Sequence, residues 1–250
     1  MNTSATMDPV VLDNAELIQA KQDLIDAGLV LEAEGLGDLT RGHVSIRVPG
    51  NPSLLIMKPH SYGFAEITMD NIVTCDMEGK KIGTGGRRHS EVFIHTEIYK
   101  ARPDVNSVIH VHPTHAVALS ATGREMRQIS QPATCFVDGL PYFTETIELI
   151  RTKDMGAGVA KALGSHKAVL MRNHGVAVVG ANVAESTILS ILLESACQIQ
   201  LLAEASGGIG EEFPAHSVQA SHDAITKPEQ YTINFEYLRR KVRRSIGRLA

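Results

Sequence analysis

The apolar positions along the chain recur at helical spacing in some segments and alternate with polar residues in others. Six short runs are β-branched or alternating, which predicts strands. They are His43–Val48, Leu54–Met57, Asn71–Asp76, Ser107–Val111, Ala168–Met171 and Val176–Val179. A spacing of three or four residues predicts helices in other segments. These are Asn14–Ala33, Ser90–Ala101, Pro113–Thr122, Lys153–Leu163, Asn182–Ala205 and Asn234–Ser245.

Strands and helices interleave without a repeat or a low-complexity linker, which predicts a single α/β domain over residues 1–250. Its core spans about 14–205, and a C-terminal tail covers 206–250. We expect loops or irregular chain over residues 80–88, from the end of the helix at Thr122 to residue 148, and over residues 206–227. Gly, Ser and His are frequent in the last of these segments. The helix Asn182–Ala205 is expected to turn its apolar residues inward, Ile199 and Leu202 included.

Composition and charge are those of an ordinary globular protein. Hydrophobic residues make up 43% and charged residues 21%, and the net charge is −4. This charge gives no reason to expect nucleic acid or an anionic membrane as a partner. The basic run from Arg239 to Arg244 is interpreted as a solvated or subunit-facing helix.

The cysteines and the N-terminus favour a cytoplasmic protein. Cys75, Cys135 and Cys197 are far apart and odd in number, so they predict neither a disulfide framework nor a zinc knuckle. The first ten residues lack the basic start and apolar run of a signal peptide. We expect no apolar run that approaches the ~20 residues needed to cross a bilayer.

Two histidines in one predicted strand form the sharpest chemical feature. Side chains two positions apart on a strand share one face, so His110 and His112 point the same way. Two such imidazoles can bind one metal ion at ~2.1 Å each, although two buried, hydrogen-bonded core histidines would show the same pattern. His174, in a turn between apolar strands, is the best third ligand, or a turn histidine bonded to the backbone. Glu91, at the start of a helix, is the candidate fourth group, or an ordinary surface glutamate.

Several motifs occur in an order that resembles the class II aldolase/adducin family. The resemblance runs from about Gln19 to Ala205. Its pieces are Gly35-Leu36-Gly37-Asp38, Gly42-His43-Val44-Ser45, Lys58-Pro59-His60-Ser61, Ser90-Glu91-x-x-x-His95, Val108-Ile109-His110-Val111-His112-Pro113 and Asn173-His174-Gly175.

This resemblance implies a three-layer fold, in which helices flank a nine-stranded, mainly antiparallel sheet. It implies a homotetramer with active sites at subunit interfaces, to which tail residues such as Tyr231 or His216 could contribute. It also implies that His110, His112 and His174 bind a divalent metal ion and that Glu91 is a ligand of the resting site or the acid/base. Three imidazoles suit Zn²⁺ best, with Mn²⁺ or another divalent transition metal as the alternative.

Departures from the family's sugar-phosphate aldolases bear on the reaction. Where those enzymes use small polar residues to bind a phosphate, this chain has His43, His60 and His89. A phosphate pocket is therefore doubtful, and the pattern resembles the family's hydroxy-aromatic acid decarboxylases, of the 3,4-dihydroxyphthalate decarboxylase kind. In that interpretation His43, His60, Ser61 and Ser90 would bind a small-molecule carboxylic acid.

Three functions follow from the resemblance and its departures. The first is a metal-dependent carbon–carbon lyase that decarboxylates a hydroxylated aromatic or heteroaromatic acid. The second is an aldolase that acts on an unphosphorylated hydroxy-keto acid or sugar. The third is a non-enzymatic assembly protein of the adducin type, which is disfavoured because all three histidines and the glutamate are present.

Overall fold

The computed structural model describes residues 15–247 of the chain. Within this part, one sheet of eight strands forms the centre of the molecule, in the order β4-β3-β2-β1-β5-β8-β7-β6. The strands are β1 (His43–Arg47), β2 (Leu54–Met57), β3 (Val73–Asp76), β4 (Lys81–Ile82), β5 (Ser107–Val111), β6 (Tyr142–Phe143), β7 (Ala168–Met171) and β8 (Gly175–Gly180). Every neighbouring pair is antiparallel except β6 and β7.

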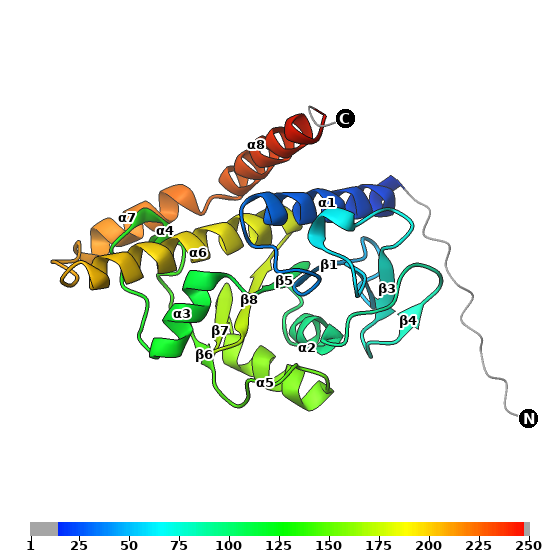
Figure 1. Ribbon diagram of the computed structural model, residues 1–250, viewed down its shortest axis with the longest axis horizontal. Coiled ribbons are helices and arrows are strands. Elements are labelled where there is room, and N and C mark those ends of the chain that lie inside the picture. The colour runs from blue at the N-terminus through cyan, green and yellow to red at the C-terminus, as the bar shows by residue number, and fades with distance from the viewer. Residues whose placement is uncertain (1–14, 248–250) are drawn as a thin grey trace, which may run out of the picture.

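Helices cover both faces of the sheet (Figure 1). They are α1 (Ala15–Ala33), α2 (Val92–Ala101), α3 (Thr114–Thr122), α4 (Gln131–Thr134), α5 (Lys153–Leu163), α6 (Val183–Ala205), α7 (Ala215–Ile225) and α8 (Pro228–Ile246), with a short 3-10 helix, η1 (Phe64–Glu66). The apolar side chains of α1, α6 and α8 pack in one core cluster, and those of α2 and α5 in another. The three-layer, mainly antiparallel α/β fold is thus confirmed.

The sheet has eight strands in the described part of the chain rather than the expected nine. Two of these, β4 and β6, are only two residues long, and β4 lies in the segment that was expected to be a loop. Both are outermost strands, where a single ladder hydrogen bond decides whether a strand is counted. Strand number at the sheet edges is therefore the weakest part of the expectation.

Alternation along the strands separates the two cores. On β5, Val108 belongs to the cluster beneath α2 and α5, whereas Ile109 belongs to the cluster beneath α1 and α6. Side chains on a strand point alternately to the two faces, so His110 lies on the same face as Val108. β1 is paired with β5 so that His43 lies opposite His110. Both imidazoles therefore face the α2 layer.

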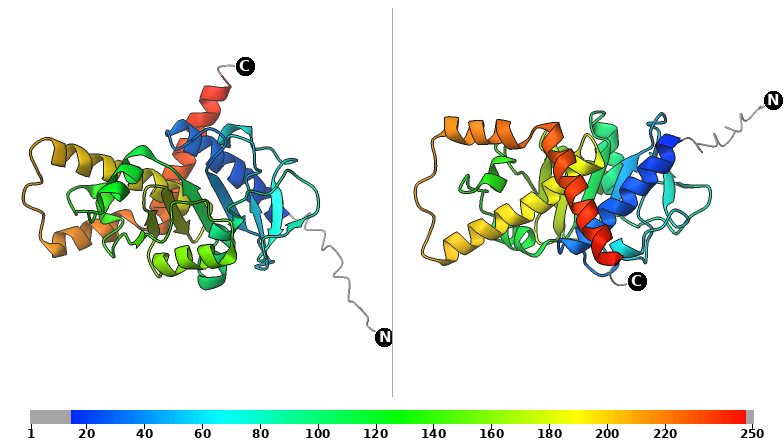
Figure 2. Two further views of the ribbon diagram at one scale, coloured as in Figure 1. Left: turned by 60° about the horizontal axis from the view of Figure 1, so that its bottom comes forward. Right: turned by 90° about the horizontal axis from the view of Figure 1, so that it is seen from above.

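The tail from residue 206 is more regular than expected. It forms α7 and a longer last helix, α8, which crosses over α1 in the right-hand view of Figure 2. The basic residues of α8 contact α1 of the same chain. Arg243 Nη2 lies 2.9 and 2.7 Å from the two oxygens of Asp26, a carboxylate that is only 1% exposed. The basic run thus packs against its own domain through an ion pair.

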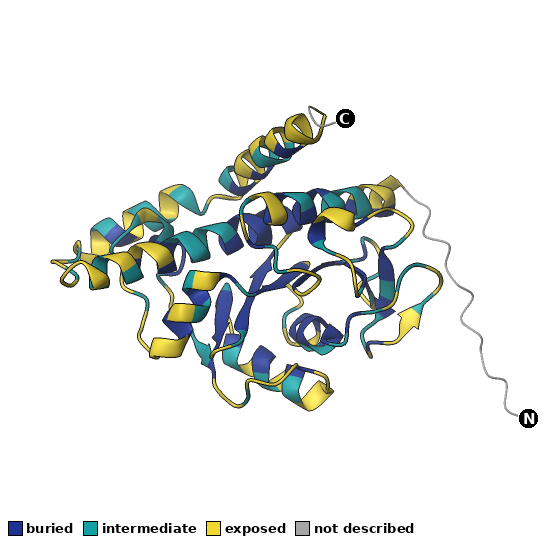
Figure 3. Ribbon diagram, in the orientation of Figure 1, coloured by how far each residue is buried: buried dark blue, intermediate teal, exposed yellow. Residues whose placement is uncertain are grey.

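The long helix α6 departs from two expectations. Its Ile199 and Leu202 are exposed, not inward, because the end of a helix about 35 Å long extends past the sheet (Figure 3). In residues 15–247, α6 is also the one helix long and apolar enough, by length and composition, to cross a membrane. The expectation that no such run exists was wrong. Half of its most apolar window is buried, as in a core helix.

The pair between Asp26 and Arg243 should stabilise the attachment of α8. We expect Asp26→Asn to lower the free energy of unfolding by about 1–3 kcal/mol, because the charged acceptor of a buried hydrogen bond is lost. Urea unfolding followed by circular dichroism measures this. The matched control is Glu34→Gln, which removes the exposed partner of Lys241 and should cost less than about 0.5 kcal/mol. Equal effects of the two changes would contradict this account.

Candidate active site

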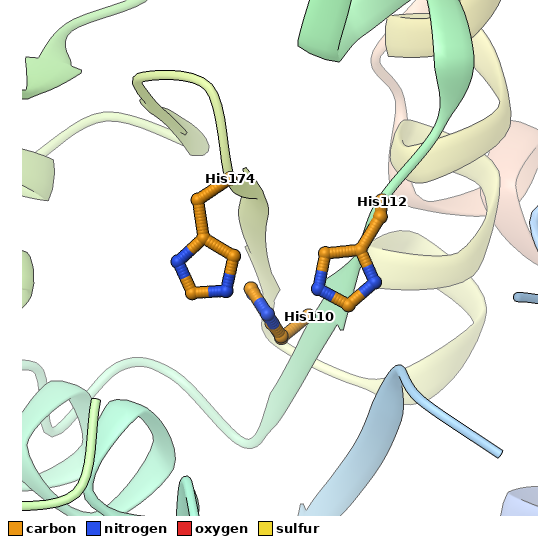
Figure 4. Close-up of side chains that lie close together, drawn as sticks. All are labelled: His110, His112 and His174. Atoms are coloured by element: carbon orange, nitrogen blue, oxygen red, sulfur yellow. The ribbon is translucent and has the colours of Figure 1, made fainter. Parts of the chain in front are cut away.

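Three imidazoles meet at one edge of the sheet. His110 lies at the end of β5, His112 follows that strand directly, and His174 occupies the turn between β7 and β8 (Figure 4). Asn173 has a φ of 59°, a left-handed conformation that gives this turn its sharp bend. One ring nitrogen of each histidine lies within 4.8 Å of one in each of the others.

The residue after His174 must be small for these rings to come together. A Cβ placed on Gly175 would lie 2.6 Å from the carbonyl oxygen of Val111 and 2.7 Å from Cδ2 of His112. Such distances are far below van der Waals contact. The glycine therefore allows the His174 turn to lie directly against the end of β5.

One hydrogen bond and one nearby carboxylate orient two of the three imidazoles. His110 Nδ1 donates to the carbonyl oxygen of Val176 at 3.0 Å, which leaves Nε2 buried and without a partner. His112 Nδ1 lies 3.1 Å from Asp38 Oδ2, although the two groups are not aligned for a hydrogen bond. Carboxylates in this position orient the histidine ligands of many metal sites. Both nitrogens of His174 are buried and without a partner.

Burial and mutual proximity keep the three rings neutral. Burial, together with His112 and Arg41, lowers the pKa of His174 to about 4. Burial, together with the neighbouring imidazoles, lowers the pKa of His110 well below its usual value. Burial also lowers the pKa of His112, an effect that Asp38 opposes. Neutral imidazoles with unshared lone pairs are the form that binds metal ions. His110, His112 and His174 therefore fit a divalent metal ion.

Glu91 lies beside this cluster and is almost fully buried. It occupies the position just before α2, but its side chain does not cap the helix. Instead Oε1 accepts a hydrogen bond of 2.9 Å from the backbone N–H of Ile150. The Glu91 oxygens lie 3.6 Å from His174 Nε2 and 3.7 Å from His43 Nε2. Burial raises the pKa of this carboxyl, against the opposing effects of the Ile150 N–H and Arg151.

A cavity of about 720 Å³ opens over the histidines and Glu91. Of the residues predicted to bind substrate, His60 and Ser90 line it. Ser61 does not line it but contacts the His60 ring, with 2.6 Å between Oγ and Nδ1. His43 is fully buried behind the cavity wall, against Glu91. The four residues thus occupy three different positions relative to the cavity.

Sequence reasoning missed several residues of the cavity. Asp38, Arg41 and Arg151 add charge, and Val117, Ile147, Leu149 and His89 complete the wall. His89 carried a signal as a departure from the aldolase pattern, and Asp38 as part of a family motif, but neither was predicted to line a cavity. Val117 comes from α3, and the others come from loops whose apposition no periodicity reports. Tyr231, a candidate from the tail, is buried in its own chain and lines a different cavity.

The sheet, its helical layers and the histidine cluster at the strand ends define a protein of the class II aldolase type. The chain belongs to the class II aldolase and adducin N-terminal domain family, whose model matches residues 22–201. It is similar in fold to L-fuculose 1-phosphate aldolase from Glaciozyma antarctica PI12, with a TM-score of 0.83, 24% identity and 96% of each chain covered.

Three relatives of similar sequence carry enzyme names, and two of these names include an aromatic compound. Two are 34% identical over 76% of this chain: 4-hydroxy-3-prenylphenylpyruvate oxygenase/4-hydroxy-3-prenylbenzoate synthase of Streptomyces roseochromogenus subsp. oscitans, with 67% of its length covered, and decarboxylase NovR of Streptomyces niveus, with 69%. The 3,4-dihydroxyphthalate decarboxylase of Arthrobacter keyseri is 28% identical over 78% of this chain and 83% of its own. The resemblance drawn from the motifs is confirmed.

The histidine cluster generates a prediction about metal content. We expect the wild-type protein to bind one divalent ion per chain, and His174→Ala to weaken that binding by at least roughly 100-fold, since a direct ligand matters more than its hydrogen-bond partners. Calorimetric titration of Zn²⁺ and Mn²⁺ into chelator-treated protein measures this. His166→Ala, in the turn after α5 and outside the cavity, serves as the control and should leave the affinity unchanged. Unaltered binding in His174→Ala would exclude this cluster as the metal site.

Proposed function

We propose that the protein is a metal-dependent carbon–carbon lyase that decarboxylates a hydroxylated aromatic or heteroaromatic carboxylic acid. The observation that carries the proposal is the buried Glu91 carboxyl, which lies beside three neutral imidazoles at the base of a cavity with both apolar and basic walls. The names of the relatives support the same class of reaction.

The walls suit a flat acid. Val117, Ile147 and Leu149 offer aliphatic surface to a ring. Arg151 makes no ion pair within residues 15–247 and can meet a carboxylate in the cavity, as can His60 at the rim. Ser90, and Ser61 through its contact with His60, would complete the carboxylate-binding groups, and His43 would support them from behind.

The metal ligands in this proposal are His110, His112 and His174, with Zn²⁺ as the first expectation and Mn²⁺ or another divalent transition metal as the alternative. When bound, a divalent ion supplies Lewis-acid stabilisation to the negative charge that develops on the substrate. Asp38 would hold the His112 ring in place.

Glu91 would move the proton. When the bond to the carboxyl carbon breaks, its electron pair stays on the ring carbon and CO₂ leaves. The protonated Glu91 carboxyl gives its proton to that carbon and regains one from solvent. The Ile150 N–H holds Oε1, so Oε2 is the oxygen free to carry the proton.

The alternative is retro-aldol cleavage of an unphosphorylated hydroxy-keto acid or sugar. In that reaction Glu91 would move a proton beside the same metal ligands.

We further propose that residues 1–250 form a single domain and that the protein is a cytoplasmic homotetramer with active sites at subunit interfaces. It would act on small molecules and on neither nucleic acid nor membranes. Light scattering of the purified protein tests the oligomeric state.

The reaction itself can be read from its products. We expect a panel of dihydroxylated benzene- and pyridine-dicarboxylates, incubated with the Zn²⁺- or Mn²⁺-loaded protein, to release CO₂ from at least one member. Mass spectrometry of the products detects the loss of one carboxyl group. Release of an aldehyde from a hydroxy-keto acid, with no CO₂ from any aromatic acid, would favour the aldolase.

Replacement of the proton donor should abolish turnover without loss of the site. We expect Glu91→Gln to lower kcat by about 10²–10⁴, because the amide cannot donate an acidic proton, while metal content is kept. Steady-state kinetics with metal analysis measures both quantities. Glu97→Gln, on the same helix but away from the cavity, is the matched control and should retain full activity. Full turnover by Glu91→Gln would show that another group moves the proton.

A further inference from the structure

A chain of four buried side chains leads from the α2 layer to Glu91. His43 and Ser45 come from β1, and His95 and Tyr99 come from one face of α2, four residues apart. His43 Nδ1 lies 2.5 Å from His95 Nε2, and His95 Nδ1 lies 2.6 Å from Ser45 Oγ. Ser45 Oγ in turn lies 2.8 Å from the hydroxyl of Tyr99. The exposed fraction of each of the four residues is 2% or less, so bulk water does not compete for these bonds.

The two imidazoles in this chain are neutral. Burial lowers the pKa of His95 to about 3. His43 is fully buried, and its hydrogen-bond partner is this neutral ring rather than a carboxylate, so a charge on it would be uncompensated. A neutral imidazole carries one N–H and one lone pair. Two arrangements, one the reverse of the other, use the Ser45 hydroxyl as both donor and acceptor. In a third, Ser45 accepts from both His95 and Tyr99, which leaves its buried O–H without an acceptor at a cost in free energy.

Tyr99 decides between the two directions. In the first, its O–H donates to Ser45, which donates to His95, which donates to His43 Nδ1. In the second, Tyr99 must donate to the carbonyl oxygen of Asn106, which is 3.5 Å away and too far for a good O–H···O bond. Burial raises the pKa of Tyr99, so the phenol stays protonated. The protonated phenol therefore donates to its nearer partner, Ser45 Oγ at 2.8 Å.

We propose that Tyr99, Ser45 and His95 are positioning residues that fix His43 as the tautomer whose Nε2–H donates toward Glu91. The His43 Nε2 atom is buried, has no partner, and lies 3.7 Å from Glu91 Oε2. Such a gap is common in a catalytic site without substrate. Because Oε1 is already held by Ile150, a donor at Oε2 stabilises the carboxylate left after proton transfer. This last role rests on the proposed function, whereas the tautomer does not.

The proposal also gives a role other than metal binding to a second group of possible metal ligands. His43, His89 and Glu91 place ligand atoms within 4.8 Å of one another, which by itself would suit a second ion. A nitrogen that carries a proton cannot bind a metal. The relay therefore makes this group a hydrogen-bonded support for Glu91 and leaves one metal ion per chain.

The experiment is magic-angle-spinning NMR of Zn²⁺-loaded protein with ¹⁵N- and ¹³C-labelled histidine, in which His43 is assigned by its loss in His43→Gln. We expect wild-type His43 to show only the Nε2–H tautomer. Ser45→Ala should give a mixture of the two tautomers, and so should Tyr99→Phe, which removes only the hydroxyl. Ser45→Thr keeps a hydroxyl and should restore one tautomer. Ser190→Ala, a buried serine of α6 outside the relay, should change nothing.

Three outcomes would overturn the proposal: a wild-type Nδ1–H tautomer, a zinc-bound His43 Nε2 with two ions per chain, or a His43 tautomer unchanged in both Ser45→Ala and Tyr99→Phe. In activity, Ser45→Ala should lower kcat by about 10- to 100-fold, the usual effect of losing a partner of an active-site group. The NMR readout does not depend on turnover. Absence of CO₂ release would therefore contradict the proposed function alone, and the wrong tautomer would contradict the relay alone.

Discussion

The antiparallel pairing of β1 with β5 is the constraint on which the rest of the site depends. It places His43 opposite His110 on the face that α2 covers, where neighbouring Cβ atoms lie about 5 Å apart. A shift of one residue in this register would send either histidine into the apolar cluster on the other face. The apolar residues Val44 and Ile109 prevent the shift, because they would then face α2 in place of the imidazoles. The hydrophobic effect thus holds a polar cluster in place.

This dependence explains how far the sequence could predict the structure. Regular apolar runs were predicted to the residue in β2, β5, β7 and α5, since their burial follows from local pattern alone. The three histidines could be proposed as ligands because strand alternation and a tight turn are also local. Arg41 and Arg151 could not be predicted to line the cavity, because their positions depend on loops that meet only in the folded chain. The prediction for the tail was wrong for a different reason. Helix α7 is stabilised by tertiary packing, and the Gly- and Ser-rich segment before it obscures its helical spacing.

His95 shows what a motif cannot predict, even within a segment that was correctly predicted to be a helix. It stands four residues after Glu91 in a family motif, which suggests a place near the chemistry. The structure puts it one layer deeper, where it contacts His43 and Ser45 and no cavity. Its hydrogen-bonding role depends on the chemistry of residues on another strand, and no spacing within α2 reports that.

The segment before α5 carries two kinds of contact at once. Ile147, Leu149 and Arg151 form part of the cavity wall, and the N–H of Ile150, between them, holds Glu91 Oε1. Because backbone and side chains of one short loop cannot move separately, a change that reshapes the wall for a different ring also shifts the support of the carboxyl. Under the proposed function, substrate choice and catalytic rate would thus be mechanically linked. A lineage that acquired a new substrate through this loop would have to readjust its proton donor in the same steps.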